Sequence, residues 1–266
     1  MKRELALIGY GEAGQTFARA AAWGEGAGGY DLLPERRAAM ASDGIYAARD
    51  AAGALSGATL VLSLVTADQA LAAAESAAPH LAPGGLWCDM NSVAPETKRA
   101  AARAVEVAGA RYVDVAVMAP VEPLRLGVPL LLSGGGADEA EALMRAAGFT
   151  DLRIVGPDVG RASAIKLIRS VMVKGIEALT DEMMAAAASA GVVDEVLASL
   201  DASDKPKPWA ERAAYNLERI ATHGLRRAAE MEEAVKTLRS LGVEPLLTQG
   251  TVQRQRAAAS RKDRAA

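Results

Sequence analysis

Three glycines near the start of the chain have the spacing of a phosphate-binding turn. Gly9, Gly11 and Gly14 form the pattern G-x-G-x-x-G directly after the apolar run 5–8 and before an Ala-rich helical stretch. In such a turn the first glycine allows a tight bend, the second lets a pyrophosphate approach the backbone, and the third lets the helix pack closely on the strand. Free N–H groups at the helix N-terminus favour an anion, so the turn predicts a dinucleotide site; the alternative is a plain strand-to-helix connection. The predicted cofactor contacts here are Gly9, Tyr10, Gly11, Glu12, Ala13 and Gly14.

A carboxylate follows at the distance expected for ribose recognition. Asp31 lies 22 positions after Gly9 (31 minus 9), close to the ~20 expected of the acidic residue that binds the adenosine ribose hydroxyls. This spacing favours NAD. Arg36 and Arg37 follow closely and could instead hold the 2′-phosphate of NADP, so both cofactors stay open. The alternative for Asp31 is an ordinary turn residue before Pro34.

Lys166 is a candidate general acid/base. It follows the Gly- and Pro-containing break 156–160, at the start of a long helical pattern, where it could face the cofactor domain across a cleft. A partly desolvated lysine can exchange a proton with a hydroxyl or carbonyl group. Ser163 and Ser170 share its helix face. Taken alone, Lys166 is more readily interpreted as an ordinary solvated surface lysine.

A second cluster of polar residues lies far along the chain. His223, Arg226, Arg227 and Glu230 are spaced i, i+3, i+4 and i+7 and so project from one side of a helix. This face could bind an anionic or phenolic substrate; the alternative is a salt-bridged, solvated helix face. With only two histidines and one cysteine in the sequence, no metal site is expected.

The elements that must position these residues alternate between strands and helices in the first part of the chain. Apolar runs predict buried strands, and Ala-rich helical patterns separate them. This alternation predicts a doubly wound, Rossmann-type α/β domain over residues 1–158. Ligands collect at the carboxyl ends of parallel strands, so Val65, Thr66 and Ala67 should border the cofactor. The predicted strands cover 5–8, 58–65, 85–90, 111–117, 129–133 and 152–155. Two shorter strands are also predicted: one whose last residues are 30–33, and one at 44–46.

The pattern changes to helix alone in the remaining part of the chain. Apolar residues at spacings of three and four predict one long helix over 161–190, followed by helices at 192–200, 209–222 and 223–241. The polar stretch 201–208 is a predicted linker, and the basic tail 254–264 is interpreted as a frayed, solvated terminus rather than a nucleic-acid arm. We expect residues 159–266 to form an all-helical domain that binds substrate and dimerises.

Composition bounds the class of protein. The chain has 266 residues, is 51% hydrophobic, and has a formal net charge of −3, which argues against nucleic acid or an anionic membrane as a partner. The single cysteine, Cys88, fits a reducing compartment. The N-terminal sequence lacks the pattern of a signal peptide, and no apolar run approaches the ~18 residues of a membrane span. A cytoplasmic location is therefore expected.

Four stretches in order resemble a known family, the β-hydroxyacid dehydrogenases, with 6-phosphogluconate dehydrogenase and the imine reductases as relatives. GYGEAG (9–14) is the first, and DMNSVAP (89–95) resembles the family's D-x-S-T-x-x-P segment. YVDVAVMAP (112–120) is similar to its D-A-P-V-S-G-G substrate loop. GRASAIKLIRS (160–170) resembles its G-x-G-x-x-x-K-x-x-x-N helix start. On the residues alone, Ser92 is as readily an N-cap of the following helix.

The resemblance implies hydride transfer between a substrate carbon and NAD(P), with Lys166 as general acid/base and dimerisation through the helical domain. Ser170 stands where the family has an Asn beside the lysine and is the second predicted catalytic residue, and Ala162 replaces the family's second glycine. Met118, Ala119 and Pro120 replace Ser-Gly-Gly, which favours a larger, less acidic substrate, aromatic or otherwise bulky, over a small hydroxy acid. The resemblance places Asn91 against the cofactor and four residues against the substrate: Ser92, Met118, Ala119 and Pro120.

The sequence HGLRRAAEMEEAVKTLRSLGVEP, from residue 223 on, resembles the helical domain of a poorly characterised subset of NAD(P)-dependent oxidoreductases. There the His-x-x-Arg-Arg-x-x-Glu-Met run would complete the pocket, from its own or the partner subunit. The leading hypothesis is thus an NAD(P)-dependent oxidoreductase acting on a hydroxyl or carbonyl group. A lyase of the retro-aldol type, with no net redox change, is the alternative, and a non-catalytic NAD(P) sensor is a third.

Overall fold

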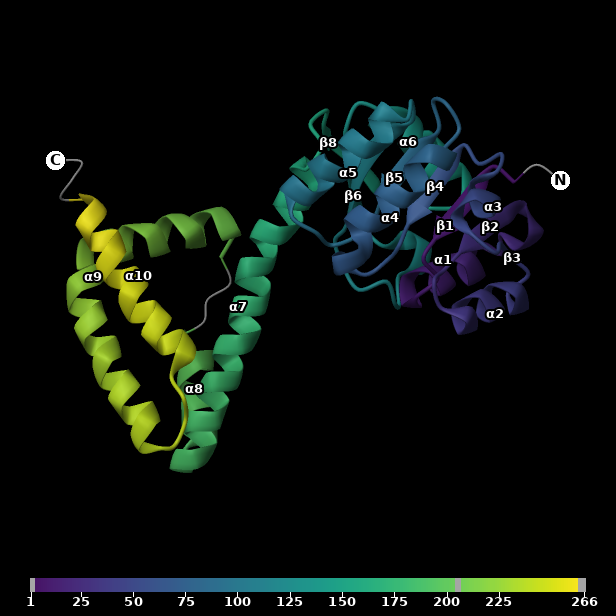
Figure 1. Ribbon diagram of the computed structural model, residues 1–266. Helices are drawn as coiled ribbons and strands as arrows, with labels where there is room; N and C mark the ends of the chain where they lie inside the picture. Colours follow the sequence, from purple (N-terminus) through teal and green to yellow (C-terminus); the bar gives the residue numbers. More distant parts are fainter. Residues whose placement is uncertain (1–2, 204–206, 263–266) are drawn as a thin grey trace. The chain divides into compact units, whose positions relative to one another are not determined.

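The computed structural model describes residues 3–203 and 207–262 and divides into two compact units, Met1–Arg169 and Ser170–Ala266 (Figure 1). This division falls inside the long helix α7 (Arg161–Ala190), whereas the sequence predicts the domain boundary at the start of that helix, after residue 158. Among the described residues, no helix is long and apolar enough to cross a membrane.

The described part of the first unit is built on an eight-stranded sheet in the order β3-β2-β1-β4-β5-β6-β7-β8. Neighbouring strands are parallel, apart from the antiparallel pair β6 and β7. The order β3-β2-β1-β4-β5-β6 is that of a doubly wound dinucleotide-binding sheet, so the predicted fold class is confirmed. The strands are β1 (Leu5–Ile8), β2 (Ala27–Tyr30), β3 (Tyr46–Ala47), β4 (Leu60–Ser63), β5 (Leu86–Asp89), β6 (Arg111–Val117), β7 (Leu130–Ser133) and β8 (Leu152–Gly156).

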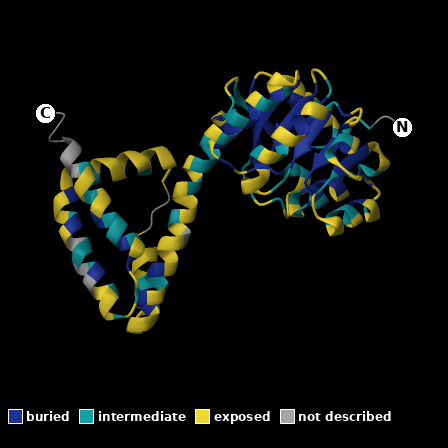
Figure 2. Cartoon of the chain, in the orientation of Figure 1, coloured by how far each residue is buried: buried dark blue, intermediate teal, exposed yellow. Residues whose placement is uncertain are grey.

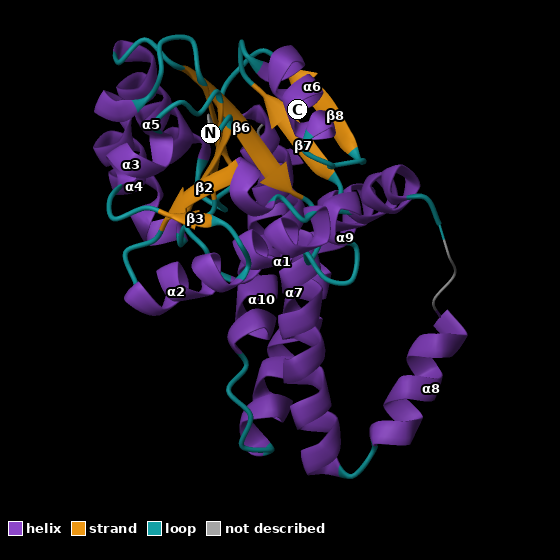
Figure 3. Cartoon of the chain, turned by 90° about the vertical axis from the view of Figure 1, so that its right-hand side faces the viewer, coloured by secondary structure: helices purple, strands orange, loops and turns teal. Residues whose placement is uncertain are grey.

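Helices cover both faces of this sheet, which explains why its strands read as continuous apolar runs. Leu7 and Leu62 pack with Phe17 of α1 on one face, while Val61 and Trp87 pack on the other. Figure 3 shows α3, α4 and α5 grouped on one side of the sheet, and Figure 2 shows the strands as the most buried part of the unit. The helices are α1 (Glu12–Ala21), α2 (Pro34–Ser42), α3 (Ala51–Leu55), α4 (Ala70–Ala77), α5 (Pro95–Val107) and α6 (Ala137–Ala146), with 3₁₀ turns η1 (Gly24–Gly26), η2 (Ala67–Gln69), η3 (Ala78–His80) and η4 (Arg125–Gly127).

The second strand lies earlier in the chain than predicted. The prediction that residues 30–33 form its end is wrong, because β2 is the glycine-containing stretch Ala27–Tyr30, and Leu32 and Leu33 are exposed. A Cβ at Gly29 would lie 3.1 Å from Met40 Cε and 3.2 Å from the Leu7 carbonyl oxygen. The close approach of α2 and β1 therefore favours glycine at this position. Because glycine is not counted as hydrophobic, a search for apolar runs does not detect this buried strand.

The described part of the second unit is helical: it comprises the rest of α7 with α8 (Val193–Ser203), α9 (Trp209–Ser240) and α10 (Leu246–Lys262). Two predictions are wrong here. The helices expected at 209–222 and 223–241 form one continuous helix, with Gly224 buried inside it, and the tail expected to fray is largely helical. α10 lies along α9 (Figure 1), where Ala228, Val235 and Val252 are buried together. Residues 204–206 of the predicted linker and 263–266 lie outside the described residues.

Candidate functional site

The glycine turn between β1 and α1 combines one crowded and one open position. Gly9 has φ +93°, and a Cβ there would lie 2.5 Å from the Leu64 carbonyl oxygen. A Cβ at Gly14 would lie 3.0 Å from the Gly9 carbonyl oxygen, so α1 packs directly on the turn. A Cβ at Gly11 would meet no atom within 4 Å. The turn is thus closely packed at Gly9 and Gly14 and open at Gly11.

The N-terminus of α1 faces this open space without a side-chain cap. Gly11 is the N-cap residue and provides no side-chain hydrogen bond to the first turn. The N–H groups that begin a helix lack intrahelical partners and carry the positive end of the helix dipole. This arrangement suits a phosphate group.

A cavity of about 680 Å³ opens beside the turn at the carboxyl ends of β1, β2 and β4. Asp31 lies at its edge, where one carboxylate oxygen accepts the Tyr10 N–H at 2.7 Å and the other accepts the Leu33 N–H at 2.9 Å. Arg36 lines the cavity, whereas Arg37 donates to the carbonyl oxygens of Asp31 and Leu32. The structure therefore presents one carboxylate and one of the two neighbouring arginines to this space.

Tyr10 contributes its backbone to the turn, because its side chain is fully buried in the core. The phenol hydroxyl donates to Asp43 Oδ2 at 2.9 Å. Burial, together with the Asp43 carboxylate, raises the pKa of Tyr10 well above its usual value. The side chain is a neutral structural donor.

A second cavity of about 490 Å³ adjoins the first, and the two share Glu12, Ala13, Leu64 and Val65 in their walls. It extends along the ends of β4, β5 and β6. Its other lining residues are Ala67, Met90, Asn91, Ser92, Val117, Ala119, Pro120, Val121 and Lys166.

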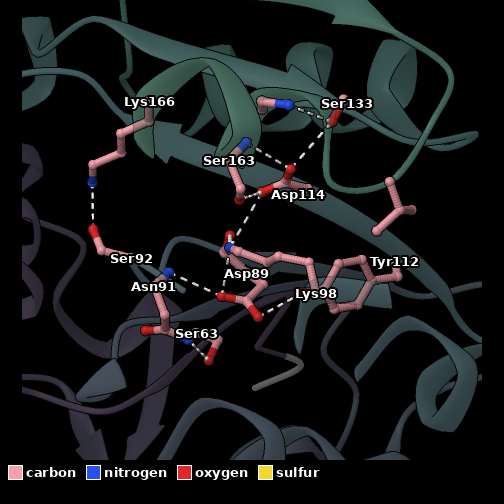
Figure 4. A network of polar contacts seen from close by, with 12 residues as sticks. Ser63, Asp89, Asn91, Ser92, Lys98, Tyr112, Asp114, Ser133, Ser163 and Lys166 are labelled. Atoms are coloured by element: carbon pink, nitrogen blue, oxygen red, sulfur yellow. Dashed lines mark hydrogen bonds and ion pairs between the residues drawn. The ribbon is translucent and has the colours of Figure 1, made fainter. Parts of the chain in front are cut away.

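Lys166 and Ser92 meet at this second cavity. Lys166 Nζ donates to Ser92 Oγ at 2.5 Å (Figure 4). The alternative interpretation of Ser92 as a helix cap is wrong: α5 begins at Pro95, and Ala94 is its N-cap residue. The serine side chain contacts a lysine 74 residues away in sequence.

Asn91 lies beside this pair with one polar atom unsatisfied. Its amide Nδ2 donates to Ser63 Oγ at 3.0 Å, and its backbone N–H donates to Asp89 Oδ1 at 2.9 Å. Its Oδ1 is buried and has no hydrogen-bond partner within the described part of the chain. Because a buried amide oxygen without a partner is costly, this atom suits a donor from a bound ligand.

A buried network lies behind the pair (Figure 4) and was missed by sequence reasoning. Lys98 on α5 bridges the carboxylates of Asp89 and Asp114, and all three side chains are fully buried. The Tyr112 hydroxyl donates to Asp89 Oδ2 at 2.6 Å, and burial beside Asp89 raises the pKa of Tyr112 far above its usual value. A signal was present: Lys98 lies three, four and seven residues before the buried residues Ala101, Ala102 and Val105, on the apolar face of α5.

Known proteins match both parts of the chain. Residues 4–147 match the family model described as the NAD binding domain of 6-phosphogluconate dehydrogenase. The chain belongs to this family. Residues 187–258 match a second model, described as a domain of unknown function (DUF1932). The family is one of NAD(P)-dependent dehydrogenases and reductases, and the first unit is an NAD(P)-binding domain, so the predicted resemblance and cofactor class are confirmed.

Three individual relatives differ in sequence identity and in the share of each chain that is matched. A conserved hypothetical protein from Sinorhizobium meliloti 1021 is 38% identical, with a TM-score of 0.65, and the match covers 98% of this chain and 89% of that one. The NAD-dependent L-serine dehydrogenase of Pseudomonas aeruginosa is 26% identical over 188 residues, which are 68% of this chain and 62% of that protein. A variant of the imine reductase from Myxococcus stipitatus, solved in complex with NAD+, has a TM-score of 0.76 at 19% identity over 98% of this chain and 94% of its own; at this identity the likeness shows the fold alone.

The residues of the first unit fit the cofactor of this family. The open approach to Gly11 and the uncapped start of α1 suit the pyrophosphate, and Asp31 is fixed where an adenosine ribose would be bound. Asn91, which lines the second cavity, offers a buried acceptor. Val65 and Thr66 line the first cavity and Ala67 lines the second, as expected for residues at the end of β4.

The remaining predicted site residues are more dispersed. Met118 packs beside Ala116, Leu131 and Ala162 and is not among the described residues that line the second cavity, although Ala119 and Pro120 are. Ser170 follows Lys166 by one turn of α7 and is the first residue of the second unit. The described part of the chain contains no group of His, Cys, Asp and Glu that could hold a metal ion.

The histidine cluster lies on α9 of the second unit. His223 and Arg226 are exposed and Arg227 is partly buried. The side chain of Glu230 lies outside the described residues. The role of these four residues in substrate binding stays a prediction.

Proposed function

We propose that the protein is an NAD(P)-dependent oxidoreductase acting on a hydroxyl or carbonyl group, with Lys166 as general acid/base. The observation that carries this proposal is the Lys166–Ser92 pair in a cavity that adjoins the dinucleotide cavity. A bound nicotinamide cofactor would supply or accept the hydride. Lys166 Nζ would take the proton from a substrate hydroxyl during oxidation and return it to the carbonyl oxygen during reduction. Ser92 Oγ would hold the lysine amine in place.

The walls of the second cavity support a bulky, weakly acidic substrate. Met90, Val117, Ala119, Pro120 and Val121 make much of its surface apolar. Among the described lining residues, Lys166 is the sole cation, so no arginine fork is present to bind a carboxylate in bidentate fashion. We therefore propose an aromatic or other bulky alcohol, or its carbonyl counterpart, as the substrate class.

A spectrophotometric screen tests the function. Purified protein is offered NAD or NADP with aromatic and aliphatic alcohols and hydroxy acids, L-serine included, and NADH or NADPH with ketones and imines. Turnover should be highest with a bulky substrate, and Lys166→Ala should lower it by about 100- to 10,000-fold, the usual contribution of a general acid/base. Lys174→Ala is the matched control, because Lys174 is an exposed lysine on the same helix.

Two results would contradict the proposal. Undiminished turnover in Lys166→Ala removes the lysine from the mechanism. Product formation without net change in NAD(P)H points instead to a lyase.

A further inference from the structure

Lys98 is a fully buried lysine to which the proposed reaction gives no part. Its Nζ donates to the Asp89 carbonyl oxygen at 2.6 Å and to Asp89 Oδ1 at 2.9 Å, and it lies 3.3 Å from Asp114 Oδ1. None of the three side chains has exposed surface. Charges removed from water are costly unless paired. The ammonium therefore holds two carboxylates together that would otherwise repel each other.

One of these carboxylates fixes the loop that carries Ser92. Asp89, at the end of β5, accepts the Asn91 N–H with Oδ1 and the Tyr112 hydroxyl with Oδ2. The turn from Asp89 to Asn91 is closed by the first of these bonds. Ser92, the next residue, is the acceptor for Lys166.

The other carboxylate fixes the first turn of α7. Asp114 accepts the Ser163 N–H at 2.9 Å and the Ser163 hydroxyl at 2.5 Å. Ser133 Oγ donates to the same carboxylate and accepts the Ala162 N–H. Ser163 and Lys166 are three residues apart and so share one side of the helix. Asp114 thus sets the direction in which the Lys166 side chain leaves α7.

We propose that Lys98 is a positioning residue for the Lys166–Ser92 pair: by joining Asp89 to Asp114, it fixes the loop bearing Ser92 relative to the helix turn bearing Lys166. Lys98 and its two partners are not among the described residues that line either cavity, so Lys98 acts through other residues. Its meaning for catalysis rests on the proposed function. A displacement of about 1 Å at a reacting group can lower turnover about 100-fold, so a bridge behind the site can decide the rate.

The test separates the bridge from the buried charge. Lys98→Met combined with Asp114→Asn removes the bridge but keeps the formal charge of the group, since one positive and two negative charges become one negative charge. The readout is the rate at which trinitrobenzenesulfonate modifies Lys166 in the cofactor-free protein, followed by peptide mass spectrometry. Lys174, which is exposed on the same helix, is the internal reference.

Lys166 should react about fivefold faster in the double variant than in the wild type, the factor that corresponds to one lost hydrogen bond of ordinary strength. Ser92→Ala, which removes the acceptor directly, should give the same increase. The rate at Lys174 should not change in either variant, whereas a general loosening of the protein would raise both rates.

A wild-type rate at Lys166 in a folded double variant overturns the proposal. If the double variant does not fold, Ser163→Ala decides, because it keeps all three charges and removes only the hydroxyl link to Asp114. The proposal then predicts faster modification of Lys166, and an unchanged rate overturns it. The measurement needs neither cofactor nor substrate, so its outcome is distinguishable from failure of the proposed oxidoreductase function.

Discussion

Gly9 and Gly11 lie two residues apart in one turn, yet their missing side chains have different consequences. At Gly9 the backbone is left-handed, and a Cβ would collide with the Leu64 carbonyl oxygen. At Gly11 the φ angle is −74°, which any residue adopts, and the space in front is open. The folded chain requires the first glycine, whereas a ligand approaching the turn requires the second.

Alanine at each position should therefore fail in a different way. Gly11→Ala should leave the free energy of unfolding unchanged or raise it by about 0.5 kcal/mol, because alanine restricts the unfolded chain. The same change should weaken NADH binding about tenfold or more, since the added methyl group occupies the approach to the backbone. Gly9→Ala should lower the free energy of unfolding by about 2 kcal/mol through backbone strain. Urea unfolding and NADH fluorescence titration measure the two effects, and wild-type NADH affinity in Gly11→Ala would contradict the assignment of the turn.

The glycine turn was predictable because its sequence pattern is local. The network of Lys98 with Asp89 and Asp114 was not, because its members belong to three different elements. G-x-G-x-x-G behind a buried strand specifies its own backbone within a few residues. Ser92, by contrast, reads as a cap because serine commonly precedes helices, but Pro95 begins the helix and a lysine from α7 takes the serine hydroxyl. The spacing of apolar residues places Lys98 on the buried face of α5. It does not predict that Asp89 and Asp114 of the sheet are its partners.

At the scale of elements, α10 shows the same limit. Residues 254–264 are rich in arginine and predicted a frayed tail, yet α10 extends to Lys262 and is held by contacts with other elements. Glu182 of α7 accepts the N–H groups of Leu247 and Thr248 and the Thr248 hydroxyl, in the manner of an N-cap. Val252 is buried against α9. Most strands were predictable from apolar runs and α7 from apolar periodicity, whereas β2 and α10 depend on partners remote in sequence.

The Glu182 contact should make the stability of α10 depend on pH. Desolvation opposes the charge of this buried carboxylate, but the donors at the start of α10 outweigh it and hold the pKa of Glu182 below its usual value. Because the folded-state pKa is the lower one, the stabilisation is full above the unfolded-state pKa of about 4.3 and is lost as pH falls through the folded-state value.

Glu182→Gln should accordingly lower the free energy of unfolding by about 1 kcal/mol at pH 7, the usual size of a capping interaction. The difference from the wild type should shrink as the pH falls below 4. Urea unfolding across this range measures it, with Glu195→Gln on the exposed surface of α8 as control. A difference that stays constant into acid would show that the charge of Glu182 is not what holds α10.

At the scale of the whole molecule, most of the exposed large hydrophobic side chains of the described residues belong to the second unit. Large hydrophobic side chains are exposed along each of its helices, with Val171 at 77%, Leu217 at 68% and Leu246 at 68%. Figure 2 shows the helices of the second unit as largely exposed and the sheet of the first unit as buried. Apolar side chains that gather on the surface of a soluble protein commonly mark a site of protein–protein contact. We therefore propose a second copy of the chain as the partner that covers it.

Light scattering after size-exclusion chromatography should give a mass twice the 27.5 kDa of the chain. Ile176 on α7 is 47% exposed, and Ile176→Glu should shift the protein towards the monomer, because a carboxylate buried in an apolar interface without a partner is costly. Val107→Glu is the matched control: Val107 is 90% exposed at the end of α5 in the first unit, and its substitution should leave the mass unchanged. A wild-type protein that elutes as a monomer at micromolar concentration would contradict the proposal, since an exposed surface of this kind would then have to be tolerated in water or covered by a different partner.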